Sequence, residues 1–417
     1  MAILTLETTN ENISWVIYKN PMTQEQSGVP FEKPLRKGMI YGWYVEPTQF
    51  RVFFDQENGD PSFYKNESNN YLNADKVLCS YAYCGMIGNM LDATMKKLHE
   101  KDIVCQNKIT LNTVWIPNAH IARSFQKHFS SIVIEMEPLG SKLFNIVFSG
   151  DTTIHYLLNV VNVFCLMQAL EDRRVFVDLT EATIDKYAQC LNLIDAPYYI
   201  RYIFLSRCVP DYNVFKKVSV ALAKEGWTFF YGDTQKQRFN AIKKVLRNGG
   251  NNLHDIGCGE LYYSVPLSQN YKEIIAWDSD DYLMERNKLY LKKKNVNNVI
   301  LKNRFSIEDF IHLEKDSDIL ITEMLEHIEL EEANEILNGL SSIKFSKLVI
   351  TLPNTSFNKY YLLDGQYRHY DHKWEPTYEE SVELISNNFK NHEIQIEKIG
   401  DMVEGESVST MFVIKGK

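Results

Sequence analysis

Cysteine is scarce in this chain, and no two cysteines have the spacing of a redox or metal-binding pair. The 417 residues include seven cysteines, none of them in a CxxC motif. Scattered cysteines in odd number are typical of reduced thiols in a large intracellular chain, whereas disulfide frameworks belong to small secreted ones. We therefore expect a cytoplasmic protein without structural disulfides.

A signal peptide and a long uninterrupted apolar run are also missing. The opening residues MAILTLETTNENISW have no basic segment and reach Glu7 early, so we expect no signal peptide. The most apolar window, residues 156–170, is interrupted by Asn159, Asn162 and Gln168 and is short for a membrane span. We expect it to form a buried helix, and we expect no association with a membrane.

Positive charge is not in excess. The chain has 45 Lys and Arg against 54 Asp and Glu, for a net charge of −9. Such a protein cannot coat long stretches of nucleic acid by charge alone, although it can grip the end of a strand. Its apolar content of 45% is ample for sizeable cores, and its length predicts two or three domains.

No internal repeat or low-complexity linker divides the chain, but its pattern changes along its length. The first half mixes strands and helices in no regular order, which predicts an α+β domain over residues 1–225. Its strands are expected at 132–138 and 143–150, and its helices at 80–98, 155–170 and 180–194. The segment 206–235 is interpreted as the connection between the domains.

The second half, residues 226–417, alternates strands with helices, which indicates βαβ units and an α/β, Rossmann-like, mostly parallel sheet. Two late strands with a short connection predict an antiparallel hairpin at the sheet edge. Together these make a seven-stranded sheet. The strands are expected at 251–257, 272–278, 296–303, 317–322, 347–354, 393–400 and 409–416, and the helices at 281–294, 305–313, 329–341 and 378–389.

The first of these strands runs into HDIGCGE, residues 254–260, whose two glycines allow a sharp turn and a close approach of a ligand. The second strand ends at Asp278, where a carboxylate can accept hydrogen bonds from both hydroxyls of a ribose. A single GxG is also compatible with an ordinary tight turn. Asp255 before the glycines and Asp278 after the next strand favour a nucleotide-type cofactor.

A second cluster of chemical groups follows the fourth strand, where ITEMLEHIEL contains Glu323, Glu326 and His327. Glutamates are also common in the first turn of a helix, so this motif alone is ambiguous. Further along, YRHYDHKWEP adds His369 and His372. Two glutamates with two histidines suit a divalent cation such as Mn²⁺ or Mg²⁺ better than zinc.

These segments resemble known families. Asp255, Gly257, Gly259 and Asp278 resemble the first motif of S-adenosylmethionine-dependent methyltransferases, which usually carry another glycine where this chain has Leu261. EMLEHIELEEA, TLPNTSFN and RHYDHKWE look like the signature of the Hen-type RNA methyltransferases, although the family's Trp-Thr-Arg end is replaced here.

The resemblance implies roles for individual residues. It implies that one metal ion is bound, and that S-adenosylmethionine is the cofactor, with Ser306 and Ile307 near its adenine. The implied metal ligands are Glu323, Glu326, His327 and His372, and the implied cofactor contacts are Asp255, Gly257, Gly259 and Asp278.

The resemblance extends to the first domain, in which LTLETTNENISWVIYKNP and LFNIVFSG look like the N-terminal domain of the bacterial members; QKQRFNAI, residues 235–242, looks like their entry to the catalytic domain. The bacterial family works with a polynucleotide kinase-phosphatase and an RNA ligase in RNA repair. The resemblance thus implies a hetero-oligomer whose first domain supports the ligase.

The expected reaction is methyl transfer to the 2′-hydroxyl of the 3′-terminal ribose of RNA. A metal ion can lower the pKa of that hydroxyl and can recognise the free 2′,3′ diol of a strand end. Either His369 or His327 could serve as general base, and Arg368 could neutralise the last phosphate. Two alternatives stay open: a weakly active or non-catalytic scaffold subunit of a repair complex, and a small-molecule methyltransferase.

Overall fold

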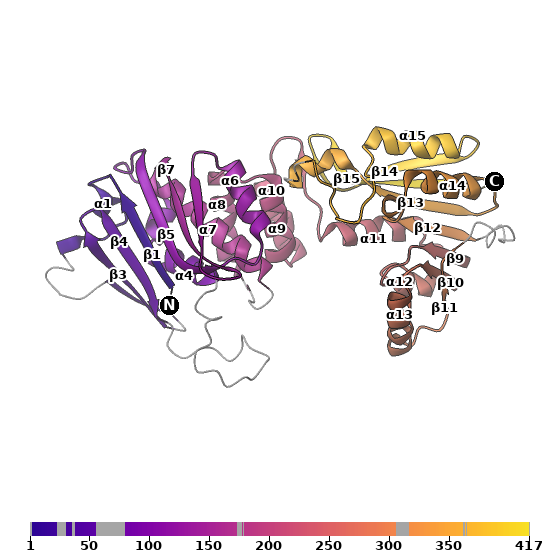
Figure 1. Ribbon diagram of the computed structural model, residues 1–417, viewed down its shortest axis with the longest axis horizontal. Helices are drawn as coiled ribbons and strands as arrows, with labels where there is room; N and C mark the ends of the chain where they lie inside the picture. The colour runs from indigo at the N-terminus through magenta and orange to yellow at the C-terminus, as the bar shows by residue number, and fades with distance from the viewer. Residues whose placement is uncertain are drawn as a thin grey trace. The chain divides into compact units, whose positions relative to one another are not determined.

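The computed structural model describes residues 2–22, 31–35, 38–55, 80–172, 177, 179–305, 317–361, 363 and 365–416. The chain forms two compact units, Met1–Leu222 and Ala223–Lys417 (Figure 1). The border lies after Leu222, where the sequence pattern placed it after residue 225. Each unit is described here by itself.

The N-terminal unit is built on a seven-stranded sheet in the order β2-β3-β4-β1-β5-β7-β6, in which every pairing is antiparallel. Only the last two strands follow from the sequence pattern, because the central strand β1 has no clean alternation and pairs with distant segments. The strands are β1 (Ala2–Thr8), β2 (Phe31–Leu35), β3 (Gly38–Glu46), β4 (Gln49–Asp55), β5 (Cys105–Trp115), β6 (Val133–Pro138) and β7 (Leu143–Thr152).

Helices lie at the three expected positions of this unit and also at others that were not expected, and together with the sheet they make an α+β domain. The expected helix over 80–98 is interrupted at Leu91, and Thr180 caps α8 by accepting from the Thr183 N–H. The helices are α1 (Ile13–Val16), α4 (Ser80–Met90), α5 (Asp92–Lys96), α6 (Ala119–His128), α7 (Ile154–Glu171), α8 (Glu181–Leu193), α9 (Tyr198–Cys208) and α10 (Tyr212–Leu222).

Helix α7 is long and apolar enough to cross a membrane by composition, but 83% of it is buried inside the protein. Its polar side chains are bound by neighbouring elements: Asn159 donates to the Met95 carbonyl, and Gln168 to the Asn118 carbonyl. Tyr187 donates its hydroxyl hydrogen to Asn162. These bonds are typical of a core helix, because buried polar groups need specific partners.

The C-terminal unit contains an eight-stranded sheet in the order β11-β10-β9-β12-β13-β15-β14-β8. The first five strands in this order pair in parallel, and the remaining pairings are antiparallel. The strands are β8 (Trp227–Thr228), β9 (Gly250–Ile256), β10 (Tyr271–Asp278), β11 (Val299–Asn303), β12 (Asp318–Thr322), β13 (Lys347–Pro353), β14 (Glu393–Val403) and β15 (Glu406–Lys415).

The expectation of a seven-stranded sheet was therefore wrong by one strand. Strand β8 has two residues, too few for any periodic pattern, and it pairs with β14. The expected hairpin of β14 and β15 is present, but β8 rather than the hairpin forms the edge.

Helices cover both faces of this sheet. Along β12 and β13, Leu320 and Val349 pack with residues of α11 and α13, whereas Ile319 and Ile350 pack with residues of α14 and α15. The helices are α11 (Thr234–Val245), α12 (Ser264–Leu267), α13 (Asp281–Lys294), α14 (Leu330–Ser341) and α15 (Tyr378–Asn388). The expected helix over 305–313 lies almost wholly outside the described residues.

Candidate active site

The site lies at the carboxyl ends of β9, β10 and β12. From β9, the first strand of the alternating part, the chain adds β10 on one side and places β12 on the other. Such a reversal of strand order leaves a crevice at the carboxyl ends, where α/β sheets bind ligands. The loops after Ile256, Asp278 and Thr322 meet there.

The loop after β9 passes close to its neighbours in a left-handed conformation. Gly257 has φ +73°, and a Cβ there would lie 2.4 Å from Cγ of Met324. Leu261, where the methyltransferase motif usually has glycine, also has a positive φ of +60° and is buried. Asp278 accepts from the Gly259 N–H at 2.9 Å, which ties the loop to β10.

The structure separates the two acids expected to contact a cofactor. Asp255 is fully buried and accepts from the Ser264 hydroxyl at 2.5 Å. Burial raises the pKa of Asp255 to about 6. It lines neither of the two cavities beside the loop, so its contacts position the loop rather than a ligand, whereas Asp278 lines one of them.

Two cavities flank the glycine loop, and Glu323 lines both. The first, which we call the Asp278 cavity, has a volume of about 740 Å³. Its lining includes Gly257, Gly259, Asp278, Phe305, Met324 and His327. Ser306 and Ile307, the residues expected near an adenine, follow Phe305 directly but lie outside the described residues.

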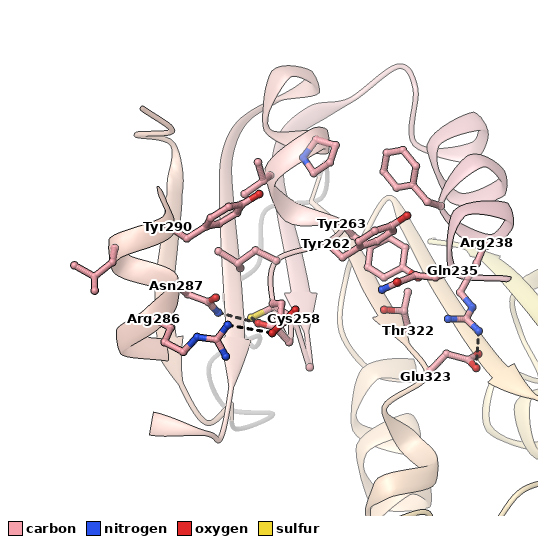
Figure 2. Close-up of a pocket in the computed structure, with 18 residues that line it drawn as sticks. Gln235, Arg238, Cys258, Tyr262, Tyr263, Arg286, Asn287, Tyr290, Thr322 and Glu323 are labelled. Carbon is pink, nitrogen blue, oxygen red and sulfur yellow. Dashed lines mark hydrogen bonds and ion pairs between the residues drawn. The ribbon is translucent and has the colours of Figure 1, made fainter. Parts of the chain in front are cut away.

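The second, which we call the Tyr262 cavity, has a volume of about 970 Å³ (Figure 2). Aromatic rings and polar side chains alternate on its walls. They include Gln235, Arg238, Phe239, Tyr262, Arg286 and Tyr290.

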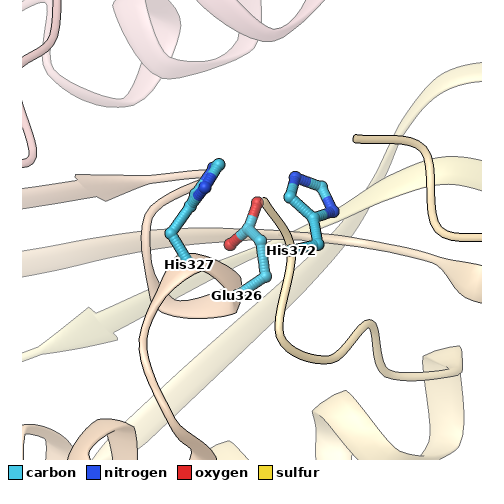
Figure 3. Close-up of side chains that lie close together, drawn as sticks. All are labelled: Glu326, His327 and His372. Carbon is cyan, nitrogen blue, oxygen red and sulfur yellow. The ribbon is translucent and has the colours of Figure 1, made fainter. Parts of the chain in front are cut away.

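Three of the four expected metal ligands converge (Figure 3). Ligand atoms of Glu326, His327 and His372 lie within 4.8 Å of one another. Glu326 is fully buried, and neither of its carboxylate oxygens has a hydrogen-bond partner among the described residues. Burial, followed by the charge of Glu323, raises the pKa of Glu326 well above its usual range.

Hydrogen bonds outside the ligand atoms hold the loop that carries His372 next to this cluster. The Lys373 N–H donates to the Glu326 carbonyl at 2.8 Å, and His372 Nδ1 lies 2.5 Å from Oε1 of Glu375. Although burial acts to raise it, hydrogen bonds from His372, Asn358 and the Arg368 backbone lower the pKa of Glu375. An ionised Glu375 orients the imidazole, as carboxylates behind metal-bound histidines do.

Glu323, the fourth expected ligand, lies outside this cluster. Its Oε2 is 2.7 Å from Nη2 of Arg238, a residue of α11 (Figure 2). Its backbone φ of +45° lies in the left-handed region that glutamate rarely adopts. The structure thus brings Glu326, His327 and His372 together and holds Glu323 beside them.

The two remaining candidates, Arg368 and His369, occupy different settings. The Arg368 guanidinium donates to Asn358 Oδ1 and to the carbonyls of Asn354 and Val408, at 2.7, 2.5 and 2.7 Å respectively. These contacts make it a brace between loops and do not support the expected phosphate contact. His369 is exposed and bonds through Nδ1 to Asp371, which also lies 3.1 Å from Nδ1 of His327.

This set of donors fits a divalent cation. An ionised carboxylate with two empty oxygens is costly to bury, and a cation among it and two imidazoles would offset that cost. Burial is the largest cause of the lowered pKa of His327, which favours the neutral imidazole that a metal requires. Reasoning from spacing missed Arg238 and Glu375, because neither stands in a spacing that signals a ligand.

The fold and the site define the class: an α+β domain joined to an α/β domain with helices on both faces of its sheet, with a candidate metal cluster beside its glycine loop. A family model described as the Hen1 N-terminal domain matches residues 3–226, more than half of the chain. The chain therefore belongs to the Hen1 family.

Solved structures agree over the whole length. A chain in the structure of the Pnkp1/Rnl/Hen1 RNA repair complex is similar with a TM-score of 0.80 at 22% identity, covering 99% of this chain and 100% of that one. A second structure of the Pnkp1/Rnl/Hen1 complex gives a TM-score of 0.78 at 22% identity, with 100% of each chain covered. No curated protein matches the chain.

Proposed function

We propose that this protein is an S-adenosylmethionine-dependent methyltransferase that acts on the 2′-hydroxyl of the 3′-terminal ribose of RNA. The observation that supports it most is Glu326, a buried carboxylate with both oxygens unpartnered among the described residues, between His327 and His372. This cluster stands beside the Asp278 cavity, which His327 also lines. A cation next to a nucleotide-type cofactor cavity can activate a hydroxyl group as the acceptor of the methyl group.

The cofactor would occupy the Asp278 cavity. The Asp278 carboxylate would receive the ribose hydroxyls, while Gly257 and Gly259 admit the ligand close to the backbone. Phe305 offers an aromatic face at the same cavity. Bound there, S-adenosylmethionine supplies an electrophilic methyl group on a sulfonium.

Glu326, His327 and His372 would hold a divalent cation, Mn²⁺ or Mg²⁺. Such a cation lowers the pKa of a ribose hydroxyl and favours the free vicinal diol of a strand end. Glu375 keeps His372 oriented, and the Lys373 N–H keeps the two ligand-bearing loops together.

We assign the removal of the hydroxyl proton to His369. His327 belongs to the cluster that would hold the cation, which leaves His369 as the exposed imidazole nearby. Its Nδ1 contacts Asp371, so its Nε2 is the nitrogen available to take a proton. A carboxylate that orients a histidine in this way also stabilises the imidazolium that forms.

The Tyr262 cavity and the N-terminal unit support the RNA-repair part of the proposal. Tyr262 and Tyr290 offer rings on which unpaired bases can stack, and Arg286 offers a cation. The likeness to a chain of an RNA repair complex supports a hetero-oligomer with an RNA ligase and a kinase-phosphatase. We assign the contact with the ligase to the N-terminal unit and place the protein in the cytoplasm.

The test is transfer of a labelled methyl group to RNA that ends either in a 2′,3′ diol or in a 2′,3′-cyclic phosphate. With Mn²⁺ present, we expect label on the diol RNA and none on the cyclic phosphate. His372→Ala should abolish the signal, whereas His128→Ala, an exposed histidine of the N-terminal unit, should leave it intact. Absence of transfer, with co-purification of residues 1–225 and a ligase, would favour the scaffold alternative.

A further inference from the structure

Arg238 is a buried cation at the edge of the cluster. Its side chain is 12% exposed, and its Nη2 lies 2.7 Å from Oε2 of Glu323. The same nitrogen donates to the Ser409 hydroxyl on β15 at 3.3 Å, while Nε has no partner among the described residues. An ion pair in such a place is strong, because water screens it little.

The backbone of Glu323 is fixed by hydrogen bonds, but only one of its two carboxylate oxygens has a partner among the described residues. Its N–H lies 3.2 Å from both the carbonyl and the hydroxyl oxygen of Thr351, which fixes the start of the loop after β12. Its carboxylate borders both cavities, and Oε1 has no partner among the described residues. A rotation of the side chain would turn the carboxylate from Arg238 toward the Asp278 cavity while the backbone stays in place.

The charges around this point are unbalanced. Glu323 and Glu326 are two carboxylates with a single guanidinium beside them. A divalent cation in the cluster would add positive charge next to the guanidinium, so cation and arginine would compete for the same carboxylate.

We propose that Glu323 exchanges partners: it rests on Arg238 when the cluster is empty and turns to complete the ligand set with Glu326, His327 and His372 when the cation binds. The inference rests on the proposed function only in requiring a cation at the cluster. Arg238 is then a positioning residue that sets the affinity for the cation, since every binding event must break its ion pair.

A purely structural role for Arg238 makes a different prediction. An arginine that only joined α11 to β15 would, when replaced, weaken the fold equally with and without the cation. An exchange partner would, when replaced, weaken the fold without the cation and strengthen the binding of the cation.

The test compares Mn²⁺ binding by the full-length Arg238→Gln and wild-type proteins. Titration calorimetry measures the affinity, and the melting temperature is measured with and without Mn²⁺. We expect the variant to bind Mn²⁺ about tenfold more tightly, because one nearby charge and one competing ion pair are gone. Its melting temperature should be lower without Mn²⁺ and should rise more when Mn²⁺ is added. The Mn²⁺ affinity of Arg238→Lys, which keeps the charge, should lie between those of the wild type and Arg238→Gln.

Arg286→Gln is the matched control. It removes another guanidinium of the Tyr262 cavity, 56% exposed and paired with Glu260 at 3.3 Å. Its Mn²⁺ affinity should equal that of the wild type. Unchanged or weaker Mn²⁺ binding by Arg238→Gln would contradict the exchange.

A crystal structure of the wild-type protein with Mn²⁺ decides the question even if the Arg238 variants do not fold. We expect Glu323 on the metal and its ion pair with Arg238 broken. Mn²⁺ held by Glu326, His327 and His372 with that ion pair intact would refute the exchange and leave the proposed function standing. Failure to bind Mn²⁺ at all would refute both.

Discussion

The described parts of the two domains differ in how many buried polar atoms lack a hydrogen-bond partner. In the N-terminal unit, Asn159, Asn162 and Gln168 of α7 are buried, and each makes a hydrogen bond to a neighbouring element. In the C-terminal unit, both carboxylate oxygens of Glu326 and one of Glu323 are buried without a partner among the described residues. Satisfied polar groups stabilise a core, whereas unsatisfied ones cost stability and mark a place for a ligand.

This difference teaches where each function of the chain resides. In the described part of the N-terminal unit, Asn159 Oδ1 is the one buried polar side-chain atom without a hydrogen-bond partner, so the function of that unit is expected at its surface. The described part of the C-terminal unit has several such atoms, and three of them belong to Glu323 and Glu326 at the end of β12, where chemistry is expected. Four predictions test this contrast, in order of decreasing effect.

The largest effect on stability should come from a large-to-small substitution in the core of the N-terminal unit. Phe164 of α7 is fully buried, with ring centroids of Phe125 and Phe148 at 5.3 and 5.1 Å. Phe164→Ala should cost about 3–5 kcal/mol of unfolding free energy, because it leaves a cavity. Urea denaturation measures this, with the exposed Val220→Ala as control; methyl transfer by the remaining folded protein should be unchanged. A loss of specific methyl transfer would break the contrast.

Replacing Glu326, whose carboxylate oxygens lack partners among the described residues, should instead lower activity. Glu326→Gln removes a buried carboxyl group that must lose its favourable ionisation on folding, so the protein should be more stable than the wild type in EDTA. Methyl transfer should fall by about 100-fold or more, since the cation loses a ligand. Melting curves in EDTA and in Mn²⁺ check this: the wild type should gain stability from Mn²⁺ and the variant should not. A variant that still responds to Mn²⁺ would contradict the assignment.

The pH dependence of stability should reveal Asp255. In the folded protein the pKa of Asp255 is about 6, above the ordinary value of 3.8. Its contribution to the free energy of unfolding is therefore complete below pH 3.8 and is lost as the pH rises through 6. At pH 8 the buried charge then costs about 2–3 kcal/mol. Asp255→Asn should therefore be more stable than the wild type at pH 8, and this advantage should shrink at pH 5. Urea denaturation at both pH values measures it, and an equal difference at both would refute it.

The smallest effect should come from the group behind the cluster. Glu375→Gln keeps the size of the side chain but removes the charge that orients His372. We expect about tenfold weaker Mn²⁺ binding with an unchanged fold, as for other carboxylates behind metal-bound histidines. Titration calorimetry measures the affinity, and circular dichroism controls for folding. An unchanged affinity would mean that the loop alone positions His372.

Local signals in the sequence predicted much of this structure. Thr180 before α8, Asp280 before α13 and Thr377 before α15 each accept a hydrogen bond from the first turn, so the helix starts followed from residue type. The parallel strands were predicted from short apolar segments that alternate along the chain with helical segments. The antiparallel strands β1–β5 were not predicted. Strand β1 pairs with β4 and β5, which lie far away in the sequence, and strand formation depends on such pairing.

The site divides in the same way. Glu326, His327 and His372 were found because glutamate and histidine stand at short spacings on two segments that end at the same sheet edge. Arg238 was missed because QKQRFNAI has no spacing that signals a site, and its contact with Glu323 spans 85 residues (323 − 238).

By itself, the sequence determined the kinds of groups available and the segments that carry them: a glycine loop after a strand, an acid after the next, and glutamates and histidines near two later strand ends. Only the tertiary structure decided which of them meet. It placed the buried Glu326 with two imidazoles, bonded the buried Asp255 to Ser264, and paired Glu323 with an arginine from α11. The physical reason is that electrostatic energy depends on distance and burial in space, and neither is visible along a chain.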